Sequence, residues 1–168
     1  SEGDVIWSPD GTRIAFTSNR KGTQDIFEEK ASGIGEELPR VASAEDDFVE
    51  DWSKDGRYIV YLSQRAFRIL PLFGDRKPFT FIESPYQKDE PHFSFDGKWL
   101  AYDSAESGTW QIYVASFPAA DQKRVISTSG GVVPRWRSDG KELYYLAPDG
   151  KLMAVDIQPG EKINSGCA

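Results

Sequence analysis

The chain has 168 residues, 39% hydrophobic and 28% charged, and these proportions exclude an intrinsically disordered polypeptide. Its net charge of −7 repels a phosphate backbone, so we expect no nucleic-acid partner. No apolar run approaches the roughly 18 residues of a membrane helix. Cys167 is the single cysteine, which excludes an internal disulfide. The 13% of aromatic residues, with 15 Gly and 10 Pro, favour strands joined by tight turns.

Four segments share one phrase, in which an aromatic residue is followed three residues later by Asp-Gly. In chain order they are Trp7-Ser8-Pro9-Asp10-Gly11, Trp52-Ser53-Lys54-Asp55-Gly56, Phe93-Ser94-Phe95-Asp96-Gly97 and Trp136-Arg137-Ser138-Asp139-Gly140. The leading aromatic residues are 45, 41 and 43 residues apart. A period in the low forties is typical of a propeller blade with four strands.

A second regularity follows each phrase: an aliphatic residue stands three positions after the glycine and an aromatic residue five positions after it. These short strands are expected at residues 14–16, 59–61, 100–102 and 143–145. Residues two apart lie on one face of a strand, so each copy presents the same aliphatic–aromatic pair to a neighbouring sheet. The Asp-Gly pair predicts a hairpin with a primed turn, in which glycine adopts positive φ.

Further strands complete each copy. Third strands are expected at 25–27, 67–70, 111–114 and 152–155, and fourth strands at 37–41, 79–82 and 123–126. Only residues 162–164 remain for the outer strand of the last copy, and residues 42–47 allow at most one helical turn. The sequence therefore predicts an all-β fold, a β-propeller of four four-stranded antiparallel blades. The single domain spans 1–168, with blades near 1–44, 45–85, 86–128 and 129–168.

The first repeat carries a family resemblance. Its phrase, followed by Ile14-Ala15-Phe16, Ser18-Asn19-Arg20 and Gly22, resembles the TolB-like, WD40-like propeller repeat, and the resemblance covers essentially the whole chain. Residues 89–118 and 129–155 are similar to propellers found C-terminal to membrane-anchored bacterial serine/threonine kinases. This resemblance implies a bacterial scaffold or sensor that faces the cell envelope, in an extracytoplasmic or periplasmic location.

The chain departs from that family in three places. The loop at residues 63–66 is short, Phe93-Ser94-Phe95 replaces Trp-Ser-Pro, and the family has six or more blades where this chain has four. Four blades either close into a compact ring or form a partial ring that self-associates. In a partial ring, the outermost faces are expected to expose Ile14, Phe16, Leu143 or Tyr145. In both cases Trp52 and Trp136 are expected to be buried between blades.

No residue pattern supports catalysis. His92 is the only histidine and has no second metal-ligating or nucleophilic partner nearby, so we interpret it as a polar residue of the channel or blade interface. The repeated aspartates of the Asp-Gly pairs are interpreted as turn residues. Their spacing also differs from that of the sialidase Asp box. A nucleophile elbow is missing as well. We therefore expect a protein that is not an enzyme and has no cofactor and no metal.

Charged residues before the innermost strands are the remaining candidates for a binding site on a rim or in the channel. They are Glu50, Asp51, Asp89, Glu90, His92 and Arg135. Solvated loop residues are the simple interpretation of the acidic runs, and contact with a cation or a basic peptide is the alternative. The favoured function is a non-catalytic scaffold or sensor that binds a protein or peptide. The alternatives are an accessory propeller of a prolyl-oligopeptidase-like peptidase and a free-standing TolB-like envelope scaffold.

Overall fold

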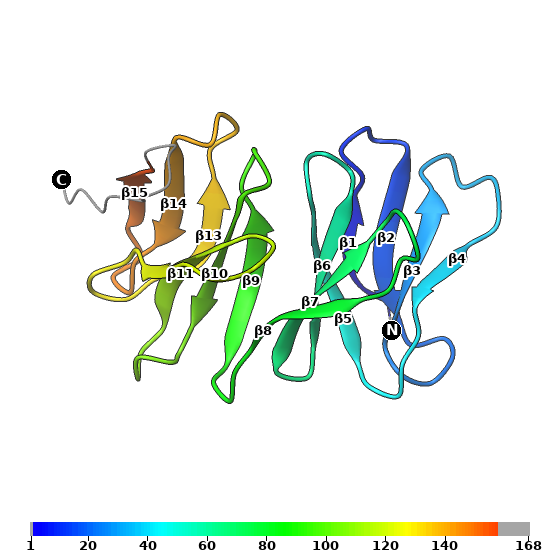
Figure 1. Ribbon diagram of the computed structural model, residues 1–168, viewed down its shortest axis with the longest axis horizontal. Helices are drawn as coiled ribbons and strands as arrows, with labels where there is room; N and C mark the ends of the chain where they lie inside the picture. The colour runs from blue at the N-terminus through cyan, green and yellow to red at the C-terminus, as the bar shows by residue number, and fades with distance from the viewer. Residues whose placement is uncertain (1, 158–168) are drawn as a thin grey trace. The chain divides into compact units, whose positions relative to one another are not determined.

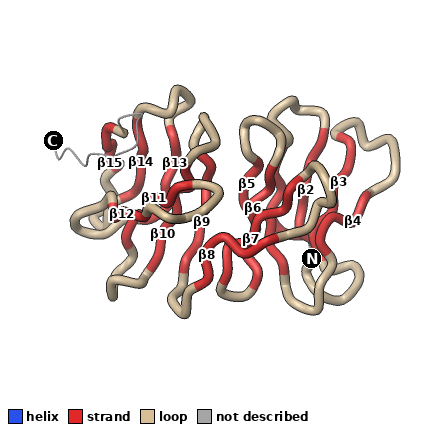
Figure 2. Tube along the Cα trace, viewed as in Figure 1, coloured by secondary structure: helices blue, strands red, loops and turns tan. Residues whose placement is uncertain are grey.

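The computed structural model describes residues 2–157, and this part of the chain consists of strands and loops without a helix (Figure 2). Its strands form four antiparallel sheets, each a simple meander in chain order (Figure 1). We call these sheets blades one to four. Blade one contains β1 (Glu2–Trp7), β2 (Arg13–Ser18), β3 (Asp25–Lys30) and β4 (Leu38–Val41). Blade two contains β5 (Asp47–Trp52), β6 (Tyr58–Ser63), β7 (Ala66–Pro71) and β8 (Phe79–Glu83).

The last two blades follow the same plan. Blade three contains β9 (Lys88–Phe93), β10 (Trp99–Ser104), β11 (Gln111–Ser116) and β12 (Lys123–Val125). Blade four contains β13 (Val132–Trp136), β14 (Glu142–Leu146) and β15 (Leu152–Asp156). The expected strand at 162–164 lies outside the described residues. The chain divides into two compact units, Ser1–Glu83 with blades one and two and Ser84–Ala168 with blades three and four, and each is described by itself.

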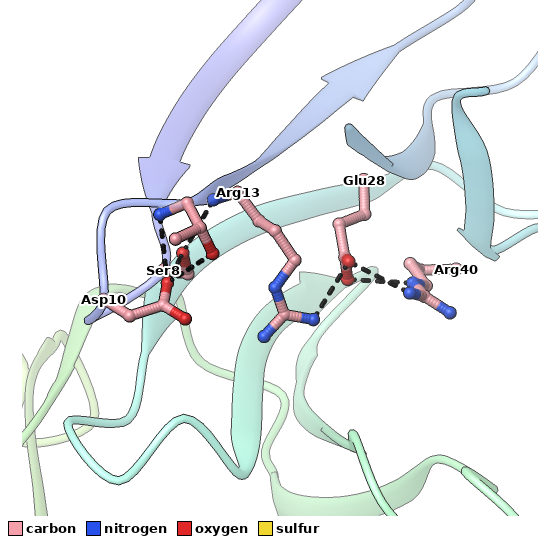
Figure 3. Close-up of polar contacts among 6 residues, drawn as sticks. Ser8, Asp10, Arg13, Glu28 and Arg40 are labelled. Atoms are coloured by element: carbon pink, nitrogen blue, oxygen red, sulfur yellow. Dashed lines mark hydrogen bonds and ion pairs between the residues drawn. The ribbon is translucent and has the colours of Figure 1, made fainter. Parts of the chain in front are cut away.

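The predicted strands are confirmed, and the segment between blades one and two, where one helical turn was allowed, forms only bends. The Asp-Gly turn is wider than the primed hairpin that we expected. The Gly11 N–H donates to the Ser8 carbonyl at 2.9 Å, which closes a type I turn, and Gly11 alone has positive φ, at 67°. The Ser8 hydroxyl donates to Asp10 Oδ1 at 2.6 Å and accepts from the Arg13 N–H at 2.9 Å (Figure 3).

This turn recurs in every blade and confirms the structural role of the aspartates. Ser53 and Asp55 in blade two repeat the hydroxyl–carboxylate bond at 2.6 Å. In blade four Arg137 replaces the serine, and its guanidinium donates two bonds to Asp139 at 2.7 and 2.6 Å. One hydrogen bond from Ser8 and two from Thr12 hold the pKa of Asp10 at about 2. The hydrogen bonds from Arg137 do the same for Asp139. Asp10 and Asp139 are therefore ionised, and all four aspartates accept hydrogen bonds within their turns.

Blades one and two pack through faces of different character. Blade two presents bulky residues, Trp52, Ile59 and Tyr61, which are at most 2% exposed; we call this its leading face. Blade one presents the trailing face, with Ala15 and Ile26 among others in the same buried cluster. The register confirms the predicted periodicity, because cross-strand partners share a face. Apolar burial between two such faces is the main stabilising term that a meander alone lacks.

Blades three and four repeat this arrangement. Leu143 and Tyr145 of the leading face of blade four are buried in one cluster with Ala101 and Ile112 of the trailing face of blade three. Trp136 packs against the same cluster but is only half-buried, which is less than we expected. The Trp136 indole N–H donates a hydrogen bond to the His92 backbone carbonyl at 3.0 Å.

The expected composition of the exposed faces was wrong. Leu143 and Tyr145 are 0% and 4% exposed because they face blade three rather than the far side of blade four. Phe16 lies on the expected outer face of blade one, but it is only 6% exposed. The Phe27 ring stacks on it at 5.9 Å, and the Arg20 guanidinium covers it at 5.3 Å. Ile14 is half-buried.

A buried ionic network reinforces blade one (Figure 3). The Glu28 side chain is 4% exposed and accepts two bonds from Arg40, at 2.9 and 3.0 Å. Arg13 donates a third bond at 3.1 Å, and its guanidinium lies 5.0 Å from the Trp52 ring centroid. A buried carboxylate needs such partners, since its desolvation costs several kcal/mol. Arg13 thus links the network of blade one to the leading face of blade two.

The two tryptophans at one repeat position provide a matched test of this packing. Trp52 is 2% exposed and Trp7 is 60% exposed. We expect Trp52→Ala to lower the free energy of unfolding by about 3–5 kcal/mol, because it opens a cavity between blades, and Trp7→Ala by less than about 1 kcal/mol. Denaturant unfolding measures both. Equal effects of the two substitutions would contradict the assigned register.

Candidate functional site

The innermost strands of the blades carry the candidate residues, and each of these strands contains a β-bulge. In β5 the bulge lies at Glu50, between the Val49–Tyr61 and Asp51–Val60 pairs. In β9 it lies between the pairs that Asp89 and His92 form with β10. In β13 it lies between Val132 and Arg135. A bulge turns a side chain out of the regular alternation, so these strands can re-aim polar groups.

The bulges also attach each described blade pair. The Val49 N–H donates to Thr17 Oγ1 of the preceding blade at 2.9 Å, and the Val133 N–H donates to Asp103 Oδ2 at 2.9 Å. A backbone hydrogen bond two residues before each of these valines also recurs. The Asp47 N–H donates to the Gln24 carbonyl, and the Gly131 N–H donates to the Trp110 carbonyl. Both pairs of blades therefore use the same two hydrogen bonds.

Glycine is required at position 131 because space is short there. A Cβ at this position would lie 2.6 Å from Tyr145 Cδ2 and 3.0 Å from Ile112 Cγ1. The backbone of blade four can approach blade three closely only with no side chain at this residue.

Two non-glycine residues at the bulges of the second unit are strained. Glu90 has φ 52° and Val133 has φ 59°. Positive φ is uncommon for any side chain and is a genuine outlier for a β-branched one. Such conformations cost of order 1–3 kcal/mol each and cluster at functional sites. The strain therefore marks the region where β9 and β13 come together.

The charged cluster of this region consists of Glu90, His92 and Arg135. Arg135 Nη2 donates to Glu90 Oε2 at 2.7 Å, and its Nη1 donates to the Pro134 carbonyl at 2.9 Å. His92 Nε2 lies 3.5 Å from the same Glu90 oxygen. The Trp136 indole N–H donates to the His92 carbonyl at 3.0 Å, which ties the two strands together. The Arg135 and Glu90 side chains are 48% and 36% exposed, so solvent and a partner can reach them.

Electrostatics keep Glu90 ionised. Burial raises the pKa of Glu90, but the hydrogen bond and charge of Arg135, assisted by His92, outweigh it and hold the pKa below its usual range. Glu90 is therefore an anion at neutral pH and stays paired with Arg135.

Asp103, which lies behind this cluster on β10, was missed by the sequence reasoning. It is 2% exposed, and its Oδ1 is buried without a hydrogen-bond partner in the part of the chain that the structure describes. Burial raises its pKa to about 6, and the charges of Asp89 and Glu90 add to the rise, although the Val133 N–H lowers it. Thr17 makes the equivalent bond in blade one without a charge. Comparison of the two repeat positions would have identified the buried carboxylate.

The structure brings together four of the six predicted site residues. Glu90, His92 and Arg135 form the cluster, and the exposed Asp89 caps it by accepting the Glu90 N–H at 3.0 Å. Glu50 and Asp51 are half-buried on β5 in the first unit. Pairing across β9 and β13 was not predicted, because it depends on the bulges.

Two properties of the described residues bear on the class of site. Between residues 2 and 157, no three His, Cys, Asp or Glu side chains are grouped so that they could hold a metal ion. In the same range no helix is long and apolar enough to cross a membrane. The chemistry of the cluster is thus that of a mixed-charge surface with an aromatic neighbour.

Meandering sheets packed leading face on trailing face are the blades of a β-propeller, and the chain has the fold of the TolB-like propellers. It is similar to the TolB protein of Agrobacterium tumefaciens, with a TM-score of 0.79 and 18% identity over 96% of this chain and 63% of that one. TolB from Acinetobacter baumannii matches at a TM-score of 0.73 and 16% identity, over 92% of this chain and 41% of that one.

A puromycin-hydrolyzing peptidase from Mycobacterium tuberculosis matches at a TM-score of 0.71 and 18% identity, over 94% of this chain and 30% of that one. This chain therefore spans less than two thirds of each of these proteins. No protein-family model and no curated protein matches the sequence.

Asp103 provides a pH test of the blade interface. Its folded-state pKa of about 6 lies above the ordinary 3.8, so the folded state holds the proton more tightly than the unfolded state. Its contribution to stability is therefore present at acidic pH and is lost as pH rises through 6. Denaturant unfolding measures the free energy of unfolding of Asp103→Asn and of wild type. We expect the difference to change in favour of the variant by up to about 2–3 kcal/mol as pH rises from 4 to 7.

Asp103→Thr is the matched control, since Thr17 shows that a hydroxyl can accept the same backbone bond. It should remove the same pH dependence and keep the fold. A difference between wild type and both variants that does not change with pH would contradict a buried, titrating Asp103.

Proposed function

We propose that the chain is a non-catalytic β-propeller module that binds a protein or peptide through the cluster of Glu90, His92 and Arg135. The observation that carries this proposal is the convergence of two strained bulges on one ion pair. Glu90 and Val133 both have positive φ, and the Glu90–Arg135 pair lies directly beside them. Strain of this kind persists only where the surrounding structure holds it, and a surface ion pair alone contributes too little stability to account for it.

The chemistry of the cluster favours recognition by side chains. Arg135 presents a planar guanidinium that can pair with a carboxylate of a partner, and Asp89 and Glu90 can accept from a basic side chain. Pro91 and Pro134 lie in the same two strands and have no N–H, so an added strand would find gaps in the backbone donors there. A partner segment with mixed charge therefore suits this surface better than strand addition.

An accessory propeller of a peptidase is the second candidate. The fold match to the Mycobacterium tuberculosis peptidase supports it, since this chain is similar to part of that protein. A third candidate is a free-standing envelope scaffold, supported by the two TolB matches. An extracytoplasmic or periplasmic location belongs to the scaffold and sensor proposals. A hydrolase domain in the parent polypeptide would favour the peptidase role, and a kinase domain with a membrane span would favour the sensor.

The binding proposal is tested with peptides selected on the wild-type chain from a random displayed library. We expect Arg135→Ala and Glu90→Gln each to weaken binding of the selected peptides by at least about tenfold, because each removes one charge of the pair. Isothermal titration calorimetry measures the affinities. Lys151→Ala is the control, because Lys151 forms an exposed ion pair with Asp149 elsewhere in blade four.

Unchanged affinity in both cluster variants would overturn the proposed site. Hydrolysis of a model ester or peptide by this chain, abolished by one substitution, would overturn its non-catalytic character.

A further inference from the structure

An apolar hollow of about 390 Å³ lies where the connection from β12 to β13 passes between blade three and blade four. Trp110, the residue before β11, lines it from blade three, and Pro148, in the turn between β14 and β15, lines it from blade four. Gly130, Gly131 and Val132 of the connection complete the part that concerns us. All five residues belong to the second unit. We call this space the hollow.

The same place in the first unit is closed by polar side chains. The hydrogen bond from the Gly131 N–H to the Trp110 carbonyl repeats the bond from Asp47 to Gln24, so Trp110 occupies the repeat position of Gln24. Asp46 precedes Asp47 and accepts the Gln24 N–H at 2.9 Å. A glycine precedes Gly131 instead, and it leaves this position without a side chain. The hollow is therefore a feature of the second blade pair and not of the repeat.

The turn that carries Pro148 is held rigidly beside the connection. The Gly150 N–H donates to the Ala147 carbonyl at 2.9 Å, which closes a β-turn with proline at its second position. The pyrrolidine ring fixes the φ angle of Pro148. A Cβ at Gly130 would lie only 2.8 Å from Pro148 Cγ, so the turn can approach the connection this closely because Gly130 has none. The hollow is thus formed before any ligand binds.

An aromatic side chain is the group that suits the hollow best. The Trp110 side chain is partly accessible, since the residue is 36% exposed, and its ring offers a flat apolar surface on which a second ring can stack. A cavity of this volume holds one large side chain. Aromatic side chains that fill such preformed pockets contribute most of the binding energy at many interfaces.

Strand β13 connects the hollow to the charged cluster. Val132 lines the hollow, and Arg135 follows three residues later, no more than about 10 Å along the strand. Asp89 and Glu90 beside it contribute two carboxylates against the one guanidinium of Arg135. This excess of negative charge complements a basic side chain. Three residues of an extended peptide span the same distance.

From this arrangement we infer that the partner is a peptide segment with an aromatic residue in the hollow and a basic residue, three positions away, at Asp89 and Glu90. The inference rests on the proposed function, because the charged cluster is one of its two points of contact. It adds a second, apolar point of contact and the spacing between the two.

Short synthetic peptides test the two contacts by NMR titration of the ¹⁵N-labelled chain. The probe is acetyl-Phe-Gly-Gly-Lys-amide, and acetyl-Lys-Gly-Gly-Phe-amide covers the opposite direction. In one of the two orders the probe should shift the amide signals of Gly130, Gly131 and Glu90 in a saturable manner. Replacement of the peptide Phe by Ala should weaken binding at least about tenfold. Replacement of the peptide Lys by Gln should weaken it at least about threefold at low salt and leave the glycine shifts in place.

Two matched variants locate the aromatic contact. Trp110→Ala should abolish the shifts at Gly130 and Gly131, because it removes the stacking surface. Trp7→Ala, at a tryptophan of the first unit that is 60% exposed, is the control and should bind the probe as wild type does. Circular dichroism confirms that each variant is folded, and the comparison of the Phe and Ala peptides needs no variant.

The inference is overturned if neither order of the probe shifts Gly130 and Gly131, or if the Phe and Ala peptides bind equally well. It is also overturned if the Lys and Gln peptides bind equally well at low salt. Library-selected peptides that require Glu90 and Arg135 but not Trp110 would overturn the inference and uphold the proposed function. Library-selected peptides that require none of the three would overturn both.

Discussion

A bulky aromatic side chain packed on small aliphatic ones is the contact on which both described blade pairs depend. Trp52 and Tyr61 are buried with Ala15 and Ile26, and Tyr145 is buried with Ala101. A single meander has two apolar faces and can cover neither of them by itself. The alternation of side chains along each strand produces the two apolar faces. These faces stabilise the fold only when a second blade covers one of them.

The same contact determines where polar groups can lie. An innermost strand that packs on the preceding blade must satisfy its bulge N–H there, and Thr17 and Asp103 are the two acceptors. The hydroxyl does this without charge, whereas the carboxylate is desolvated and has a raised pKa of about 6. At neutral pH, blades three and four are therefore less stable with Asp103 than they would be with a threonine at this position. This cost lies directly behind the Glu90–Arg135 pair, where the proposed binding site is located.

The sequence predicted the local features well, because the Asp-Gly phrase and the period-2 alternation act within a few residues. The positions of turns such as Ser8 to Gly11 and the burial of Trp52 followed directly, although the turn is of type I rather than the expected primed type. Exposure was predicted poorly, since Leu143 and Tyr145 were assigned to an open face and are 0% and 4% exposed. The contact between Glu90 and Arg135, 45 residues apart, depends on bulges at non-glycine residues, which no pattern marks. Phe16 was assigned to the correct face, but its cover by Arg20 comes from a loop.

β5 and β13 are each fixed to the preceding blade through a bulge amide, and amide hydrogen exchange measures this directly. Val49 and Val133 lie at bulges, where an unpaired N–H would exchange quickly. The hydrogen bonds to Thr17 and Asp103 predict slow exchange at both amides, close to that of the buried strands β6 and β10. Fast exchange at Val49 and Val133, comparable to that of exposed loop residues such as Ile34, would contradict the account.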